Sequence, residues 1–149
     1  MKRPHQTQIK RENYSQIMDN LYLGGIRCKK ILIENCHSAI AITDYDMGKP
    51  EWADNYVHYE LCDTSTESVE LVVNAIFGGI KFIEDNIQNG VLVYCGLGVS
   101  RSSTVVIAYI MKALKLSYED AFKYVQQKRT CVRPNALFQK VLQNFRFDN

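Results

Sequence analysis

Apolar residues are spaced along the chain in two ways, one typical of buried strands and the other of amphipathic helices. Short apolar runs beside turn residues predict four strands, at Leu21–Gly25, Ala39–Thr43, Tyr56–Leu61 and Val91–Tyr94. In the first of these, the two glycines are expected to act only as turn residues. The last run has no polar alternation, so we expect a strand that is covered on both faces of a sheet.

The strongest helical period lies between Val69 and Ile87, where apolar residues three or four positions apart form one face. Gly78 and Gly79 interrupt this face, and because each costs about 1 kcal/mol relative to alanine in a helix, close packing or a bend is expected there. Gly90 is suited to end the helix. Further helices are predicted at Ile26–Asn35, at Val105–Leu116, at Ser117–Lys128 after a sequence resembling a capping box, and from Pro134 to about Phe145.

Strands that alternate with helices indicate a single α/β domain with a central sheet. The chain has 149 residues, of which 46% are hydrophobic and 23% charged, enough for one compact core. Its net charge of +2 is too small to indicate nucleic-acid binding. No apolar stretch is as long as a membrane span, so we expect neither nucleic acid nor membrane as a partner.

The N-terminal end differs in composition from the rest of the chain. Residues 1–11 are basic but contain no apolar segment of a secretory signal. We therefore predict a solvated N-terminal arm at residues 1–15, with a localisation or binding patch as the alternative, and a folded domain at residues 16–149.

The chain has five cysteines, an odd number, and no Cys-x-x-Cys pair. This pattern argues against a disulfide framework and against a zinc site, so we predict no metal and reduced thiols in an intracellular location, cytoplasmic, nuclear or both. No cofactor is expected. Only Cys95 has a local sequence that suggests reactivity. The other four are expected to be small core residues, with Cys62 as an alternative resolving partner for an oxidised Cys95. These four are Cys28, Cys36, Cys62 and Cys131.

The segment Cys95–Arg101, here named the anion loop, carries the candidate chemistry. It lies between the apolar run Val91–Tyr94 and an apolar helix, an arrangement that forms a concave nest of backbone N–H groups able to hold an anion. Gly98 permits a close approach of the backbone to a ligand. A thiolate at one end and a guanidinium at the other are the groups of a cysteine-dependent phosphatase. The alternative is a buried structural cysteine before an ordinary helix.

With these residues the chain resembles a small, atypical dual-specificity phosphatase of the protein tyrosine phosphatase superfamily, over roughly residues 16 to 147. The resemblance includes Asn20–Gly24, Leu61–Asp63, Val91–Ser102 and Arg133–Asn135. It implies a phosphotyrosine-phosphatase-like fold, with a mixed, mostly parallel sheet and helices on both sides. It also implies two-step hydrolysis of phosphomonoesters, with phosphate, sulfate or vanadate bound in the anion loop. Phosphoinositide and RNA phosphatases of the superfamily tend to have polar loop residues, so phosphoprotein is the favoured substrate.

The resemblance assigns a role to each residue of the motif. Cys95 is the nucleophile, expected to be largely thiolate at neutral pH, and Arg101 holds two phosphate oxygens. Ser102 assists departure of the thiolate, or caps the helix, and Asp63 is the general acid, or caps the helix that follows it. The backbone N–H groups that bind phosphate are those of Gly96, Leu97, Gly98, Val99, Ser100 and Arg101.

Other residues are expected to support the site, or their roles have more than one interpretation. Asn135 is expected to brace loops near the site. Arg129 and Arg133 either contact acidic residues of a phosphopeptide or are solvated. The reserve candidates for the general acid are Glu67 and Glu70, which are otherwise charges on a helix surface.

The sequence departs from the family at two positions. Tyr94 replaces the histidine that usually precedes the nucleophile, so either its hydroxyl replaces the buttress that histidine provides or its ring only packs against the sheet. Leu97 replaces a residue that is often alanine. We therefore expect an active phosphatase with reduced turnover, acting on phosphotyrosine and on phosphoserine or phosphothreonine. The alternatives are a pseudophosphatase that binds phosphoproteins and, less favoured, a phosphatase of small phosphoesters.

Overall fold

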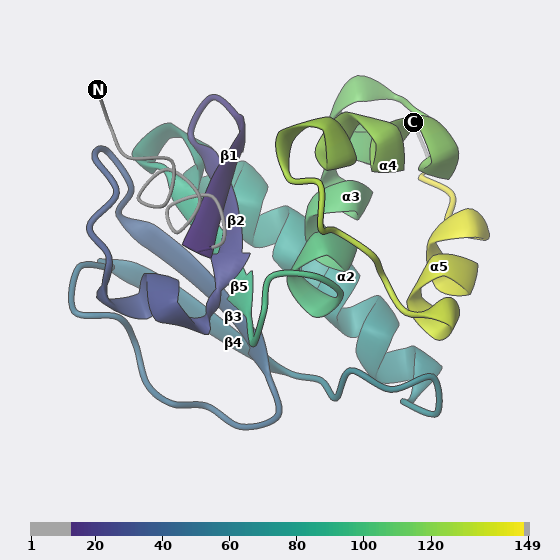
Figure 1. The fold of residues 1–149 in the computed structure, drawn as a ribbon, viewed down its shortest axis with the longest axis horizontal. Helices are drawn as coiled ribbons and strands as arrows, with labels where there is room; N and C mark the ends of the chain where they lie inside the picture. Colours follow the sequence, from purple (N-terminus) through teal and green to yellow (C-terminus); the bar gives the residue numbers. More distant parts are fainter. Residues whose placement is uncertain (1–12, 148–149) are drawn as a thin grey trace.

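The computed structural model describes residues 13–147, and its centre is a sheet of five strands (Figure 1). Along the sheet the order is β1-β2-β5-β3-β4, with β1 antiparallel to β2 and all other neighbours parallel. The predicted α/β domain with a mixed, mostly parallel sheet is therefore confirmed. The strands are β1 Tyr14–Met18, β2 Leu21–Gly25, β3 Ser38–Thr43, β4 Asn55–Glu60 and β5 Val91–Cys95.

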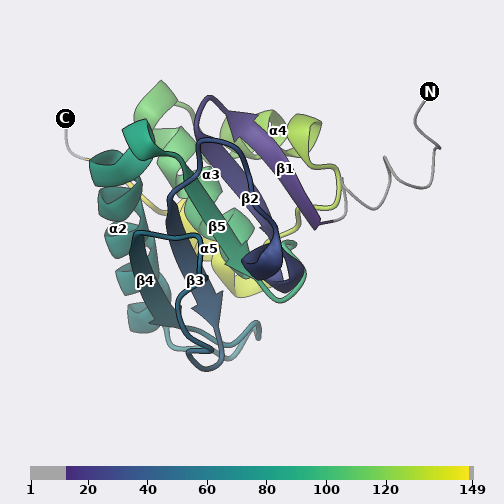
Figure 2. The ribbon, with the colours of Figure 1, turned by 90° about the vertical axis from the view of Figure 1, so that its left-hand side faces the viewer.

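Four α-helices of the described part of the chain, α2 to α5, pack on one face of the sheet, as Figure 2 shows. They bury an apolar core against alternate residues of the strands, among them Ile40, Val91 and Val93. The central helix, α3, is buried along most of its length and contacts the helices on both sides of it. The helices are α2 Val69–Asn86, α3 Arg101–Leu114, α4 Tyr118–Lys128 and α5 Ala136–Gln143.

The second face of the sheet carries a smaller core. A 3₁₀ helix, η1 (Ile26–Lys30), and the connections before β3 and β4 cover it. Leu92 and Tyr94 point into this second core while Val91 and Val93 point into the first. Strand β5 is thus covered on both faces, as its uninterrupted apolar sequence predicts.

The glycine pair of α2 is explained by close packing. A Cβ atom at Gly78 would overlap the Tyr59 hydroxyl, and one at Gly79 would lie 2.5 Å from a methyl carbon of Val105. Helix α2 therefore approaches strand β4 and helix α3 closely at these two residues. This close packing fixes the position of α3, and the first turn of α3 begins at the end of the anion loop.

The structure corrects several predicted boundaries. The predicted helix at Ile26–Asn35 is only the short η1, because Cys28 is its one buried residue and the charged side chains beside it leave no apolar helical face. Helix α3 begins at Arg101, one turn before the apolar stretch expected at Val105–Leu116, so the anion loop runs directly into its first turn. A second 3₁₀ helix, η2 (Ile87–Asn89), follows α2 and ends at Gly90.

Strand β1 was not predicted from the sequence. It is an edge strand, and only Ile17 of its five residues is buried, so it shows no apolar alternation. The sheet begins at Tyr14, ahead of the domain boundary expected at residue 16. The rest of the predicted arm, residues 1–12, lies outside the described residues.

Within residues 13–147, no helix combines the length and the apolar composition needed to cross a bilayer. The same part of the chain contains no cluster of three or more histidine, cysteine or acidic side chains arranged to hold a metal ion.

Candidate active site

The candidate site lies where three parallel strands end at the same edge of the sheet. Cys95 is the last residue of β5, Asp44 follows β3, and residues 61–63 follow β4. Open parallel sheets bind ligands at the carboxyl ends of their strands, because the loops there converge. The topology therefore brings the anion loop close to a segment that lies more than thirty residues earlier in the sequence (Figure 1).

Cys95 and Ser102 meet at the floor of the anion loop. The Cys95 sulfur lies 3.1 Å from the Ser102 hydroxyl oxygen, and both residues are buried. Ser102 is inside the first turn of α3, and the cap position of this helix belongs to Ser100. Ser102 is therefore not the helix cap, and its hydroxyl is placed to hydrogen-bond the sulfur.

The carbonyl groups of the anion loop are bonded from outside the loop. The Ile26 N–H donates to the Gly96 carbonyl at 3.0 Å, and the Arg133 N–H donates to the Val99 carbonyl at 2.7 Å. In a peptide unit the N–H and C=O point in opposite directions. Anchoring the carbonyls on the outer side leaves the N–H groups for the concave side, where an anion would sit.

Arg129 anchors the two loop carbonyls between these. Its Nε donates to the Gly98 carbonyl at 2.9 Å, its Nη2 to the Leu97 carbonyl at 3.1 Å, and its Nη1 to the Ser15 hydroxyl of β1 at 3.2 Å. Only 3% of Arg129 is exposed. Neither predicted interpretation, phosphopeptide contact or solvation, is right for this residue. Its sequence neighbours carry no sign of this role, because its partners lie about thirty residues or more away.

Glycines of two segments allow this packing. Gly98 has a backbone φ of +70°, and a Cβ there would lie 2.5 Å from the backbone of Gly24. A Cβ at Gly25 would lie 3.0 Å from the Gly96 carbonyl oxygen. Gly24 and Gly25 are the last residues of β2 and lie against the anion loop, so the prediction that they are only turn residues is wrong.

Arg101 is held at one of its three nitrogens. Its Nη1 donates to Asp44 Oδ1 at 2.6 Å and to the Leu61 carbonyl at 3.0 Å. Its Nε is buried and has no hydrogen-bond partner among the described residues. Its Nη2 lies over Gly96, 3.1 Å from where a Cβ of that residue would be. A buried N–H without a partner is costly, and an oxyanion in the loop would satisfy it.

Asp63 is connected to the anion loop through Asn135. The Asn135 amide Nδ2 donates to Asp63 Oδ1 at 2.9 Å, and the Asn135 backbone N–H donates to the Ser100 hydroxyl at 3.0 Å. The side-chain oxygen of Asn135 also caps α5 by accepting from the Phe138 N–H. Ser68 caps α2, so Asp63 is not the cap of that helix and its exposed carboxyl is available to the site.

Glu67, a reserve candidate for the acid, is occupied differently. It accepts hydrogen bonds of 2.7 Å from the backbone N–H groups of Cys62 and Ser68. These bonds favour the charged form and lower the pKa of Glu67. A carboxylate held ionised in this way shapes the 61–68 loop and is unsuited to donating a proton. Glu70 lies in the first turn of α2.

Comparison with known proteins identifies the family. The family model described as "Dual specificity phosphatase, catalytic domain" matches residues 21–147. The chain belongs to this family. Family membership places the described domain among the protein phosphatases, which are hydrolases.

Two proteins and one solved structure illustrate the similarity. Serine/threonine/tyrosine-interacting protein B of Xenopus laevis is 31% identical over 146 residues, covering 91% of this chain and 65% of that protein. Putative tyrosine phosphatase 123R of Invertebrate iridescent virus 6 is 35% identical over 145 residues, 88% of this chain and 90% of that protein. The crystal structure of human tyrosine phosphatase-like serine/threonine/tyrosine-interacting protein superposes with a TM-score of 0.78 at 29% identity, over 89% of this chain and 94% of that one. The chain thus spans 65% of the Xenopus relative and 40% of serine/threonine/tyrosine-interacting protein of Mus musculus, which is less than two thirds of either.

In this dual-specificity phosphatase domain, the ring of Tyr94 packs in the second core. The side chain is 1% exposed, and burial raises the pKa of Tyr94 to about 12, so its hydroxyl stays protonated at neutral pH. That hydroxyl hydrogen-bonds with Tyr56, which in turn donates to Asp46 at 2.6 Å. The geometry favours the packing interpretation, because this hydrogen bond leads to strand β4 and not to the anion loop.

Of the other four cysteines, two are buried and two are exposed. Cys28 and Cys36 are buried, as expected, and burial raises the pKa of Cys28 to about 11 and that of Cys36 to about 12. Cys62 and Cys131 are exposed, so the expectation that they are core residues is wrong. Cys62 follows Leu61, the residue whose carbonyl bonds Arg101, but its role as a resolving thiol stays a prediction.

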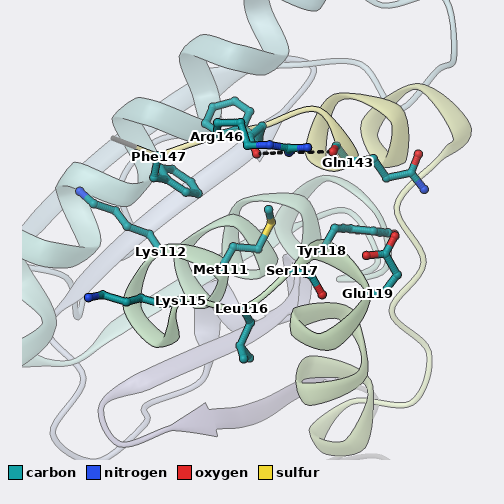
Figure 3. Close-up of a pocket in the computed structure, with 11 residues that line it drawn as sticks. Met111, Lys112, Lys115, Leu116, Ser117, Tyr118, Glu119, Gln143, Arg146 and Phe147 are labelled. Carbon is teal, nitrogen blue, oxygen red and sulfur yellow. Dashed lines mark hydrogen bonds between the residues drawn. The ribbon is translucent and has the colours of Figure 1, made fainter. Parts of the chain in front are cut away.

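A separate pocket of about 760 Å³ lies at the opposite end of α3 (Figure 3). Its lining comes from the last turn of α3, the start of α4 and the segment after α5, including Met111, Tyr118 and Phe147. A helix of fourteen residues is about 20 Å long, so this pocket is remote from Cys95. It contributes no residue to the site.

Proposed function

We propose that this domain hydrolyses phosphotyrosine and phosphoserine or phosphothreonine in proteins through a cysteinyl-phosphate intermediate. The observation that carries the proposal is the buried Arg101 Nε, which has no hydrogen-bond partner within residues 13–147, at the end of a loop that begins with Cys95. The outward carbonyls of the loop support the same conclusion, because they leave an array of N–H donors for phosphate oxygens.

In the first step, the Cys95 thiolate attacks phosphorus and the bond from phosphorus to the ester oxygen breaks. Protonated Asp63 donates its proton to the departing oxygen, which leaves as an alcohol or phenol. Backbone N–H groups and Arg101 neutralise charge on the equatorial oxygens. The exposed carboxyl of Asp63, tethered through Asn135, supports its assignment as the acid.

In the second step, water attacks phosphorus and gives its proton to the Asp63 carboxylate. The sulfur–phosphorus bond breaks, inorganic phosphate leaves and Cys95 returns as a thiolate. The Ser102 hydroxyl, 3.1 Å from the sulfur, donates a hydrogen bond to the departing thiolate. The steps balance with water as the only co-reactant, so we propose that the reaction uses no metal or cofactor.

The lining of the loop supports a phosphoprotein substrate. The residues between Cys95 and Ser100 carry no polar side chain, and Leu97 is 78% exposed at the rim. Such a rim suits the apolar stem or ring of a phosphorylated side chain more than a polyol headgroup.

A pseudophosphatase that binds phosphoproteins is the second candidate. It is favoured by relatives named as interacting or phosphatase-like proteins and by Tyr94 at the position of the family histidine. A binding module needs neither a nucleophile nor an acid, whereas this chain keeps Cys95, Ser102 and Asp63 in a connected arrangement. We therefore favour the active phosphatase over the binding module.

The proposed function is tested by assaying the wild-type protein with a chromogenic aryl phosphate. We expect steady release of phenol, inhibition by vanadate and no inhibition by EDTA. Acid quenching during turnover, followed by mass spectrometry, should find phosphate on the peptide containing Cys95. Oxyanion binding without any turnover would instead establish the pseudophosphatase.

The acid is tested by Asp63→Asn. Because the amide cannot donate a proton in the same way, we expect kcat for an alkyl phosphate to fall by roughly 10²–10⁴-fold, with a smaller loss for an aryl phosphate whose leaving group needs less protonation. Asp85→Asn, on the exposed face of α2, is the matched control and should retain wild-type kcat. Unchanged turnover of the alkyl phosphate by Asp63→Asn would reject Asp63 as the acid.

The replacement of the family histidine is tested by Tyr94→His. We expect a higher kcat near neutral pH together with a loss of stability on the order of 1–3 kcal/mol, because a smaller, more polar ring fills the second core poorly. The measurements are kcat at pH 7 and thermal unfolding, with Tyr94→Phe as the control that keeps the ring. A kcat no higher than wild type would mean that the tyrosine is compensated elsewhere.

A further inference from the structure

We propose that Asp44 is a positioning residue, which turns the free edge of the Arg101 guanidinium toward the phosphate. This inference rests on the proposed oxyanion site. Asp44 was not among the predicted site residues, because in the sequence it is one polar residue at the start of a polar loop.

The sheet explains how Asp44 reaches Arg101. Strands β3 and β5 are parallel neighbours, with Ala41 opposite Tyr94 in the register. Cys95 and Thr43 end these strands, so the residue that follows each strand emerges at the same edge. Asp44 therefore lies beside the anion loop although it is 57 positions from Arg101 in the sequence.

The hydrogen bonds of Arg101 divide its guanidinium into two edges. A guanidinium has five N–H donors, two of them on Nη1. Asp44 Oδ1 at 2.6 Å and the Leu61 carbonyl at 3.0 Å accept from Nη1. The edge formed by Nε and Nη2 is left for another acceptor, and these two donors are spaced to bind two oxygens of one phosphate.

The burial of the pair supports a positioning role over a simple surface ion pair. The Arg101 side chain is 14% exposed, and its Nε is buried, whereas the Asp44 side chain is 62% exposed at the rim. Asp44 thus contacts the outer nitrogen of Arg101 and not the side that faces the loop. Leu61, the second acceptor, precedes Asp63 by two positions, so the same contacts link Arg101 to the segment of the proposed acid.

The test compares Asp44→Ala with Asp44→Asn, whose amide oxygen still accepts from Nη1. Tungstate affinity is measured by calorimetry, and kcat and KM are measured with the chromogenic phosphate. For Asp44→Ala we expect tungstate affinity and kcat each to fall by about tenfold, because Arg101 loses its fixed orientation. Asp44→Asn should stay within about threefold of wild type. The control is Asp85→Ala, an exposed aspartate paired with Lys81 on α2, which should match wild type.

Thermal unfolding separates positioning from a general structural effect. Because Asp44 is at the rim, Asp44→Ala should unfold at the same temperature as Asp85→Ala. Tungstate binding by Asp44→Ala that equals or exceeds wild type would overturn the proposal, and so would equal losses in the Ala and Asn variants. Tungstate binding without turnover in the wild type would refute the hydrolase alone, since the affinities still decide the role of Asp44. Failure of the wild type to bind tungstate would refute both.

Discussion

Cys95→Ser is expected to abolish hydrolysis of a chromogenic aryl phosphate, with kcat lower by roughly four orders of magnitude or more. The serine hydroxyl remains protonated at neutral pH, so it supplies no anionic nucleophile at the floor of the loop. The backbone N–H groups and Arg101 are unaffected, and the variant should therefore still bind tungstate. Steady-state assays and calorimetry measure the two properties separately.

Cys131→Ser is the matched control for this variant, because Cys131 is exposed and lies outside the anion loop. It should retain the wild-type kcat. Substantial residual turnover by Cys95→Ser that vanadate still inhibits would contradict the assignment of Cys95 as nucleophile. Loss of tungstate binding together with turnover would instead indicate that the loop itself had been disturbed.

Arg101→Lys is expected to lower kcat/KM by roughly 10²–10³-fold. A lysine ammonium is a compact charge without the planar Nε and Nη2 edge, so it cannot hold two phosphate oxygens while also contacting Asp44 and the Leu61 carbonyl. Retaining the positive charge makes this change a test of geometry. Kinetics with the aryl phosphate and the inhibition constant of vanadate should both show the loss.

Arg146→Lys provides the comparison, since Arg146 is an exposed arginine after α5 that bonds only nearby carbonyls among the described residues. Its kinetics should be those of wild type. If Arg101→Lys turned over substrate as fast as wild type, the bidentate contact proposed for Arg101 would be wrong. The lack of a partner for its Nε in the described part of the chain would then need another explanation.

The candidate site residues that could be found from the sequence have both a reactive side chain and a recognisable local sequence around them. Cys95 and Arg101 stand at either end of a strand–loop–helix unit, and the nest of N–H groups between them is a local property of the chain. The parallel strands and the long amphipathic helices could also be predicted from local sequence, because the spacing of their apolar residues reflects burial on one or both faces. Edge strand β1 and the short helix η1 lack such a periodicity.

The side chains that hold the site residues in place belong to segments that lie far away in the sequence. Arg129 directly follows α4 and anchors the loop carbonyls about thirty residues before it, while Asp44 reaches Arg101 only because β3 and β5 are neighbours. Tyr94 likewise has a role that depends on which face of the sheet it meets, and the structure places it in the second core.

By itself the sequence determined the α/β class, the anion loop and the cysteine proposed as its nucleophile, because these follow from short-range patterns of polarity and from residue chemistry. Only the tertiary structure decided which side chains hold the loop and the arginine in place. A buried arginine and a solvated one have the same sequence signature, and so do an aspartate on a free surface and one beside a guanidinium. What separates them is the packing of strands and helices that lie far apart along the chain.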